Sequence, residues 1–331
     1  MGLARALAAM LGFAKAGAVR LARRAASGNR LSAVMTTPLA PPQPAAAPGF
    51  TERFWSSGDG LRLHYRDYPG QTDRPPLLCL PGLTRNARDF VQLAERLAGE
   101  WRVLCPDLRG RGDSGYARDP ASYNPLQYAE DLELLLADQA IDRFVAIGTS
   151  LGGLLAMLLA ARAPERIAGA LLNDVGPELA PAGLARIRDY LGQARSYPTW
   201  MHAARAVQET QALAFPDFQA SDWLAMAKRV MVLGGNGRIV FDYDMKIADA
   251  FGPPGSEPAV DWWPALLALN GQPVTLLRGE LSDVLTADAQ QRMALRLPGA
   301  EVVTVPRVGH APMLDEPASI AALDRLLARI Q

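Results

Sequence analysis

One serine of this chain lies between glycines in a setting that suits a nucleophile. Ser150 has Gly148 two positions before it and Gly152 two positions after it. The apolar run 143–147 before this stretch predicts a buried strand, and the apolar run 154–163 after it predicts a buried helix. A serine at so sharp a turn has its hydroxyl pushed into the open, and side chains in place of the two glycines would collide. We therefore predict that Ser150 is a catalytic nucleophile.

The same turn supplies a donor for a developing negative charge. Leu151 follows the serine and is expected at the start of the helix. The first N–H groups of a helix have no acceptor within it, and the helix dipole favours negative charge there. The backbone N–H of Leu151 is therefore predicted to form half of an oxyanion hole.

A nucleophilic serine needs a base, and the chain has three histidines. His64 lies in an early strand pattern and is expected to be structural or exposed. His202 falls in a segment that reads as an inserted cap, where it is badly placed to be a fixed base. His310 lies in the loop directly after the last predicted strand, at the sheet edge where the serine turn is expected. A lone histidine is more often structural than catalytic, but the requirement for a base makes His310 our prediction.

An imidazole acting as a base needs a carboxylate that fixes its tautomer and stabilises its cation. Asp283 follows the predicted strand 274–279, one strand before the histidine loop, and is the first choice, with Glu280 as a neighbour. Asp174, at the end of the strand after the serine helix, is the rival. Either aspartate is alternatively a helix cap or a turn residue.

Composition limits the other classes of function. The chain has 331 residues, 49% of them hydrophobic, and 34 basic residues balance 34 acidic ones. The balance gives no sign of a nucleic-acid partner or an anionic membrane surface. Cys79 and Cys105 lie in apolar, strand-like runs and are expected to be free and buried, without a disulfide framework or a metal site.

Residues 1–48 are expected to lie outside the fold. The first 34 residues contain six basic residues and no acidic one, which fits an amphipathic helix, a targeting peptide or a translated upstream extension. Lys15 interrupts the apolar part, so no run reaches the length of about 18 residues that a membrane span needs. Met35 would serve as an alternative start, and 38–48 reads as a Pro/Ala linker. We expect a cytoplasmic protein, with targeting or peripheral membrane association through this segment as the alternative.

Strand and helix patterns alternate through most of the remaining chain. Predicted strands are 53–57, 61–68, 75–80, 101–106, 143–147, 167–175, 274–279 and 301–306, and predicted helices include 88–97, one that begins near Asn124, 154–163, 287–297 and 319–330. Such alternation predicts an α/β fold with a mainly parallel sheet and helices on both faces. The core is expected to comprise 49–175 and 265–331.

The segment 176–264 interrupts this alternation. It is long, rich in tryptophan and helix-like, and predicts a helical cap over the carboxyl ends of the strands, where such sheets bind ligands. Its aromatic residues and methionines suit an apolar pocket, or else attach the cap to the core. They are Tyr190, Tyr197, Trp200, Phe215, Phe218, Trp223, Phe241, Tyr243, Trp262, Trp263, Met201, Met226, Met231 and Met245.

From about residue 50 to the end, the chain resembles the α/β-hydrolase superfamily, with its order of serine, acid and histidine. Four further stretches resemble the family's motifs: the oxyanion loop at 80–83, the loop after the fourth strand at 107–114, the acid loop at 278–283 and the histidine loop at 308–310. Pro81 stands where many members have histidine, and the resemblance gives the second oxyanion donor as the backbone N–H of Leu83. It implies a hydrolase of an ester-like bond that needs no cofactor, with the cap shaping the substrate pocket.

These observations together predict a serine hydrolase that forms an acyl-enzyme on a small or medium apolar carboxylic ester, most simply a carboxylesterase. Lactonase, carbon–carbon bond hydrolase and acyltransferase activities remain alternatives on the same residues. A non-catalytic, small-molecule-binding member of the family is the alternative from another class. The expected partner is a small ester-like molecule, with no nucleic acid and no stable membrane span, and the pattern leaves the oligomeric state open.

Overall fold

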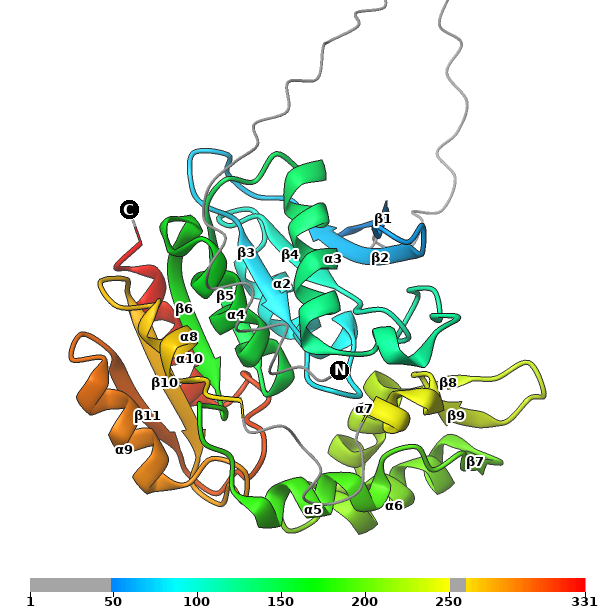
Figure 1. The fold of residues 1–331 in the computed structure, drawn as a ribbon. Helices are drawn as coiled ribbons and strands as arrows, with labels where there is room; N and C mark the ends of the chain where they lie inside the picture. Colours follow the sequence, from blue (N-terminus) through cyan, green and yellow to red (C-terminus); the bar gives the residue numbers. More distant parts are fainter. Residues whose placement is uncertain (1–48, 251–259, 331) are drawn as a thin grey trace, which may run out of the picture. The chain divides into compact units, whose positions relative to one another are not determined.

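An eight-stranded sheet is the centre of the computed structural model, which describes residues 49–250 and 260–330 (Figure 1). Its strands, in spatial order, are β1 (Thr51–Ser56), β2 (Arg62–Tyr68), β4 (Val103–Pro106), β3 (Leu77–Leu80), β5 (Phe144–Thr149), β6 (Ile167–Asn173), β10 (Val274–Gly279) and β11 (Glu301–Val305). The pairs β1–β2 and β2–β4 are antiparallel, and the five other pairs are parallel. The prediction of a mainly parallel sheet is confirmed.

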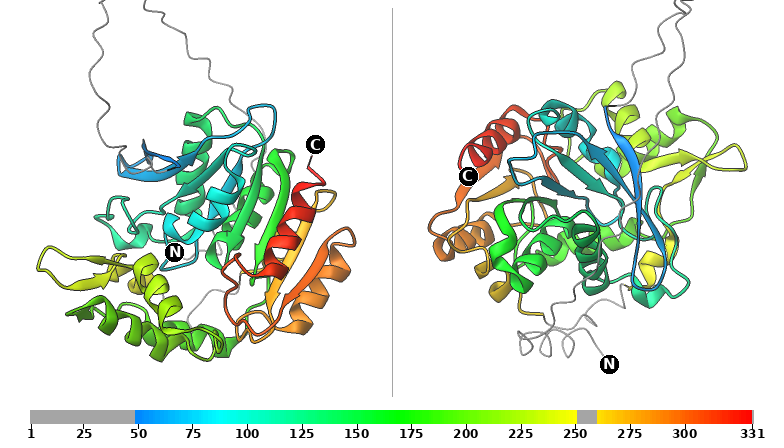
Figure 2. Two further views of the ribbon diagram at one scale, coloured as in Figure 1. Left: turned by 180° about the vertical axis from the view of Figure 1, so that it is seen from behind. Right: turned by 90° about the horizontal axis from the view of Figure 1, so that it is seen from above.

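Helices cover both faces of this sheet (Figure 2). One face packs against α3 (Pro125–Asp138), α4 (Leu151–Arg162), α8 (Trp263–Leu267) and α9 (Ala287–Arg296), and the other against α2 (Val91–Leu97) and α10 (Pro317–Leu327). Short 3₁₀ helices are η1 (Ala87–Phe90), η2 (Pro120–Ser122), η3 (Pro164–Arg166) and η4 (Met245–Ala250).

The central strands read as continuous apolar runs because both of their faces are buried. In β5, Phe144 and Ala146 belong to one core cluster, whereas Val145 and Ile147 belong to the other. Side chains of a strand alternate between its two faces, so a run of apolar residues fills both layers at once. This burial fixes the strand that carries Ser150.

The sequence predicted a helical cap at 176–264, but the described part of this segment also contains strands. It contains α5 (Pro181–Tyr190), α6 (Trp200–Gln211) and α7 (Ala220–Val230), together with a small antiparallel sheet of β7 (Ser196–Tyr197), β9 (Ile239–Phe241) and β8 (Met231–Leu233). Gly237 has a φ of 74° in the turn between β8 and β9. Short apolar runs around a glycine-rich turn are typical of a hairpin, and here they form β8 and β9.

This segment contacts the carboxyl ends of the parallel strands. The backbone N–H of Gly112, in the loop after β4, donates to the carbonyl of Asp242, and the N–H of Asp244 donates to the carbonyl of Gly110. The arrows of the parallel strands in Figure 1 point toward α5–α7 accordingly. The loops that carry predicted site residues therefore lie between the sheet and this segment.

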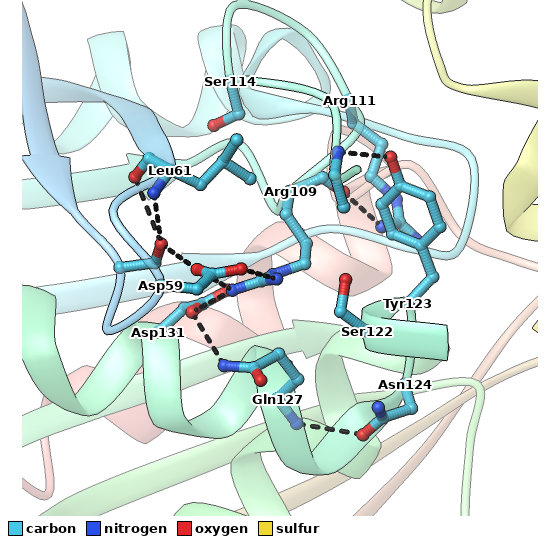
Figure 3. Close-up of polar contacts among 12 residues, drawn as sticks. Asp59, Leu61, Arg109, Arg111, Ser114, Ser122, Tyr123, Asn124, Gln127 and Asp131 are labelled. Atoms are coloured by element: carbon cyan, nitrogen blue, oxygen red, sulfur yellow. Dashed lines mark hydrogen bonds and ion pairs between the residues drawn. The ribbon is translucent and has the colours of Figure 1, made fainter. Parts of the chain in front are cut away.

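A buried ion pair fixes the loop after β4 (Figure 3). The side chain of Arg109 is fully buried and donates to both oxygens of Asp131 at 2.7 Å, and Asp131 belongs to α3. Asp59, which is half-exposed, accepts two longer hydrogen bonds of 3.1 Å from the same guanidinium. Arg109 thus ties the loop to α3 through Asp131 and to the β1–β2 turn through Asp59.

We expect the Asp131→Ala variant to lose about 3 to 5 kcal/mol of unfolding free energy, because it leaves the buried Arg109 charge without its main partner. The matched Asp59→Ala variant removes an exposed partner of the same arginine and should lose less than about 1 kcal/mol. Urea unfolding of both variants measures the difference. Equal losses would contradict the assignment of Asp131 as the main partner.

Other expectations concern the cysteines and the N-terminal residues. Cys79 and Cys105 are free and buried, as predicted. The proposed extension and linker at 1–48 lie outside the described residues. None of the described helices combines the length and apolar character that crossing a bilayer requires.

Candidate active site

Ser150 lies at a tight turn between β5 and α4. Its backbone has φ 52° and ψ −117°, a strained conformation for a residue with a side chain. A Cβ atom on Gly148 would lie 2.4 Å from the carbonyl oxygen of Gly152, and one on Gly152 would lie 2.0 Å from that of Leu80. The two glycines are therefore required by close backbone approach, as the sequence predicted.

The imidazole of His310 joins this serine to an aspartate. His310 lies in the loop after β11, and its Nε2 is 3.0 Å from Oγ of Ser150. Its Nδ1 is 2.6 Å from Oδ2 of Asp174, a carboxylate that is fully buried. The imidazole can accept the serine proton at one nitrogen while the carboxylate faces the other.

Asp174 is held in place by donors from the neighbouring strand and turn. It directly follows β6 with a φ of 56°, in the left-handed region that aspartate and asparagine tolerate best among residues with side chains. Its Oδ1 accepts a hydrogen bond of 2.9 Å from the backbone N–H of Gly279, and its Oδ2 accepts one of 2.6 Å from the Ser282 hydroxyl. These donors fix the carboxylate against His310.

Asp283, the acid preferred from the sequence, does not contact His310. Arg186 of α5 donates to both of its oxygens, at 2.5 and 2.8 Å. Those hydrogen bonds hold the pKa of Asp283 below its ordinary value, against the effect of partial burial. The carboxylate that contacts His310 is therefore that of Asp174, the rival candidate from the sequence, and not that of Asp283. The turn after β10 directs Ser282 toward Asp174 and Asp283 toward Arg186 of α5.

The other two histidines lie elsewhere. Nδ1 of His64 is 2.7 Å from a carboxylate oxygen of Asp107, and both side chains are buried. His202 is exposed on α6, with Nδ1 2.8 Å from the Thr199 hydroxyl. Neither lines the pocket that contains Ser150 and His310.

Both predicted oxyanion donors are next to the serine. Leu151 begins α4, and Leu83 lines the same pocket as Ser150. A Cβ on Gly82, the residue before Leu83, would lie 3.8 Å from Cβ of Ser150. The fully buried Arg111 donates from Nε to the carbonyl oxygen of Leu83 at 2.7 Å, so a buried cation fixes the backbone directly after the Leu83 N–H.

A mainly apolar pocket opens at Ser150 and His310. Its apolar wall comes from both the core and the segment 176–262: Leu83, Phe90, Ile187, Val207, Phe215, Met226, Val230, Phe241, Met313 and Leu314. Of the aromatic residues and methionines singled out in the sequence, Tyr190, Tyr197, Phe215, Phe241 and Met226 line it. Phe218 and Trp223 instead pack against one another, with ring centroids 5.0 Å apart.

Polar groups occupy a few positions on this wall. Arg85 donates to both carboxylate oxygens of Asp89, at 2.7 and 2.9 Å, so that its charge is balanced within the wall. Burial raises the pKa of Tyr190 above its ordinary value. Arg195 also lines the pocket, is exposed, and has no side-chain partner among the described residues.

Sequence reasoning missed two polar side chains of this site. Ser282 lies within the predicted acid loop 278–283 but had no role of its own, although its hydroxyl donates to Asp174. Arg111 lies within the predicted loop 107–114 and likewise had no role, although it donates to the carbonyl of Leu83. The position of Ser282 directly before the favoured aspartate was a signal for its role. No local sequence pattern marks the role of Arg111.

Comparisons with known proteins identify the family to which this chain is similar. A model of the alpha/beta hydrolase family matches residues 77–323. The 3-hydroxybutyrate-oligomer hydrolase of Cupriavidus necator is 34% identical over 267 residues, which cover 78% of this chain and 90% of that protein. An esterase of Mycobacterium tuberculosis is 30% identical over 269 residues, which cover 76% of this chain and 82% of that protein.

A solved structure is similar over most of the chain. The alpha/beta hydrolase from Novosphingobium aromaticivorans is 62% identical, with a TM-score of 0.83, and the match covers 86% of this chain and 100% of that one. The turn at Ser150, the order of strands and the family match all point the same way. This chain belongs to the alpha/beta hydrolase family.

Proposed function

We propose that this protein is a serine hydrolase that cleaves a carboxylic ester through an acyl-enzyme intermediate. The observation that carries the proposal is the unbroken series of contacts from the Ser150 hydroxyl through His310 to the buried Asp174. Nucleophile, base and orienting acid within hydrogen-bond reach are the arrangement that activates a serine. The serine hydroxyl and His310 both line the pocket, where a substrate carbonyl can reach them.

In the proposed acylation step, Ser150 Oγ attacks the ester carbonyl carbon and His310 Nε2 takes the hydroxyl proton. The carbonyl oxygen becomes an oxyanion, which the backbone N–H groups of Leu83 and Leu151 would stabilise. Asp174 stabilises the imidazolium. The C–O bond to the alcohol then breaks, and His310 gives its proton to the departing oxygen.

In the proposed deacylation step, water replaces the alcohol. His310 takes a proton from this water, whose oxygen attacks the acyl carbon, and the same N–H groups stabilise the second oxyanion. Collapse of that intermediate releases the carboxylic acid and returns the proton to Ser150. The scheme uses only side chains and backbone groups of this chain.

The proposed substrate is a small or medium ester with a mainly apolar acyl or alcohol part. Support comes from the pocket wall, where residues of η1, α5, α6 and α7 and of the loop near Met313 present apolar side chains. We take 176–264 as the cap that supplies half of this wall. Apolar contacts of this kind bind a substrate without selecting one acyl or alcohol group, so esters of several chain lengths should be tested.

A panel of nitrophenyl esters and lactones of graded size tests the proposed function. We expect turnover of the nitrophenyl esters, and a radiolabelled organophosphate should label Ser150 and no other residue. Peptide mass spectrometry locates the label. Labelling at another residue, or tight binding of esters without turnover, would contradict the proposal and favour a non-catalytic binding protein.

A second candidate substrate is a short oligomer of a hydroxy acid, an ester that ends in a carboxylate. The relative in Cupriavidus necator, named for hydrolysis of 3-hydroxybutyrate oligomers, aligns over 90% of its own length. In this chain, Arg195 lines the pocket, is exposed and has no side-chain partner among the described residues. Its guanidinium would be free to bind the terminal carboxylate.

We expect the Arg195→Gln variant to raise KM for 3-hydroxybutyrate dimer about two- to fivefold, because an exposed ion pair contributes less than about 1 kcal/mol. KM for a neutral nitrophenyl ester should not change. Arg205→Gln, an exposed change on α6 outside the pocket wall, is the matched control. An equal change in KM for charged and neutral esters would show that Arg195 does not bind the terminal carboxylate.

A further inference from the structure

One imidazole nitrogen of His64 is buried without a partner. The side chain of His64 is fully buried in β2, and its Nδ1 lies 2.7 Å from Oδ2 of Asp107. Its Nε2 is also buried and has no hydrogen-bond partner within the described part of the chain. A buried polar atom left unpaired is unfavourable, so a group that binds Nε2 would stabilise the fold.

Two carboxylates lie beside this imidazole. One oxygen of Glu52, one oxygen of Asp113 and one imidazole nitrogen of His64 all lie within 4.8 Å of one another. Because Nδ1 is engaged with Asp107, Nε2 is the nitrogen free to bind a cation. Both acidic residues are exposed, and neither forms an ion pair with another described residue. Two neighbouring carboxylates repel each other, and a bound cation would relieve that repulsion.

Local hydrogen bonds bring the three residues together. In the β1–β2 ladder, Glu52 pairs with Arg66 two positions from His64, so both side chains lie on the same face of the hairpin. The backbone N–H of Asp113 donates to Asp107 Oδ2 at 3.0 Å, the same oxygen that His64 contacts. The backbone N–H of His64 also donates to the Ser114 hydroxyl at 2.8 Å.

We propose that His64, Glu52 and Asp113 bind one divalent transition-metal ion, with Asp107 orienting the imidazole from behind. A carboxylate on the second nitrogen of a metal-binding histidine is the usual partner that fixes its tautomer. Bonds of about 2.0 to 2.2 Å place neighbouring ligand atoms about 3 to 3.5 Å apart, so the exposed carboxylates need to close by about 1 Å.

The ligand set selects the class of metal. An imidazole with two carboxylates suits Zn²⁺ or Mn²⁺, whereas Mg²⁺ and Ca²⁺ prefer oxygen ligands alone. None of the three ligands lines the pocket at Ser150, so the ion would be structural. It would tie the β1–β2 edge of the sheet to the loop after β4.

Calorimetric titration of the full-length protein with Zn²⁺, after removal of metal by a chelator, tests the site. We expect Glu52→Gln with Asp113→Asn to weaken Zn²⁺ binding by more than about 100-fold, since loss of one outer partner already weakens it about 10- to 100-fold. Asp73→Asn with Glu130→Gln removes the same number of charges at exposed positions outside this cluster, and should bind Zn²⁺ like the wild type. Zn²⁺ should also raise the Tm of the wild type and the control, but not of the first variant.

Anomalous diffraction at the zinc edge locates the ion. The expected peak lies at Nε2 of His64 and is absent from the Glu52→Gln, Asp113→Asn protein. Equal Zn²⁺ binding by both double variants, a peak at His310 alone, or no saturable binding by the wild type would each overturn the proposal. The test uses changes in exposed side chains, because His64 variants disturb a buried hydrogen bond and would confound folding with binding.

Discussion

The Ser150→Ala variant is expected to lose ester turnover by about 10⁵-fold or more, which is the largest effect that we predict for a single change. Removal of a serine nucleophile also makes its histidine and aspartate useless, since the three act as a unit. The oxyanion donors Leu83 and Leu151 are untouched and should leave a small residual rate over water. Steady-state kinetics on a nitrophenyl ester measures the loss, at enzyme concentrations high enough to detect the residual rate.

The fold of that variant should be unchanged, because serine and alanine both have a Cβ atom and meet similar strain at the φ of 52°. The matched control is Ser122→Ala, which removes a hydroxyl of η2 outside the pocket wall and should keep full activity. Urea unfolding of both variants separates lost chemistry from lost structure. Full activity in Ser150→Ala would remove the serine mechanism altogether.

The strand pattern was predictable because it follows from burial. Strands such as Val274–Gly279 are buried on both faces, so that their apolar runs have clear ends at Pro273 and Glu280. The turn at Ser150 was predictable for a different reason: only glycine fits at Gly148 and Gly152, and that requirement is visible in the sequence. Where a single local constraint determines the structure, pattern reading suffices.

The partner of His310 could not be predicted in this way. Asp174 and Asp283 both follow strands whose carboxyl ends reach the same edge of the sheet, and β10 lies between β6 and β11. What separates them is the direction of side chains in the turn after β10, where Ser282 faces Asp174 and Asp283 faces Arg186. That direction depends on packing against α5, which belongs to the segment whose structure the sequence left least defined.

Substitution of Asp174 and of Asp283 by asparagine distinguishes the two candidates for the acid. We expect Asp174→Asn to lower kcat by about 10³- to 10⁴-fold, because an amide facing Nδ1 of His310 disfavours the tautomer that can accept the serine proton. Asparagine tolerates the left-handed backbone of this position, and its side-chain oxygen can still accept from Gly279, so the structure should be retained. The pH profile of kcat, measured beside kcat itself, reports on the environment of His310.

Asp283→Asn is the matched control, since it makes the same chemical change one strand away. It weakens an ion pair with Arg186 that is partly exposed, and should change kcat less than about tenfold and unfolding free energy by less than about 1 kcal/mol. Ser282→Ala, which leaves the Asp174 carboxylate charged but removes one donor, should fall between the two in kcat. Loss of activity in Asp283→Asn with survival in Asp174→Asn would return the role of the acid to Asp283. Loss of activity in Asp174→Asn with survival in Asp283→Asn would establish that Asp174, the carboxylate that contacts His310, is the one that orients it.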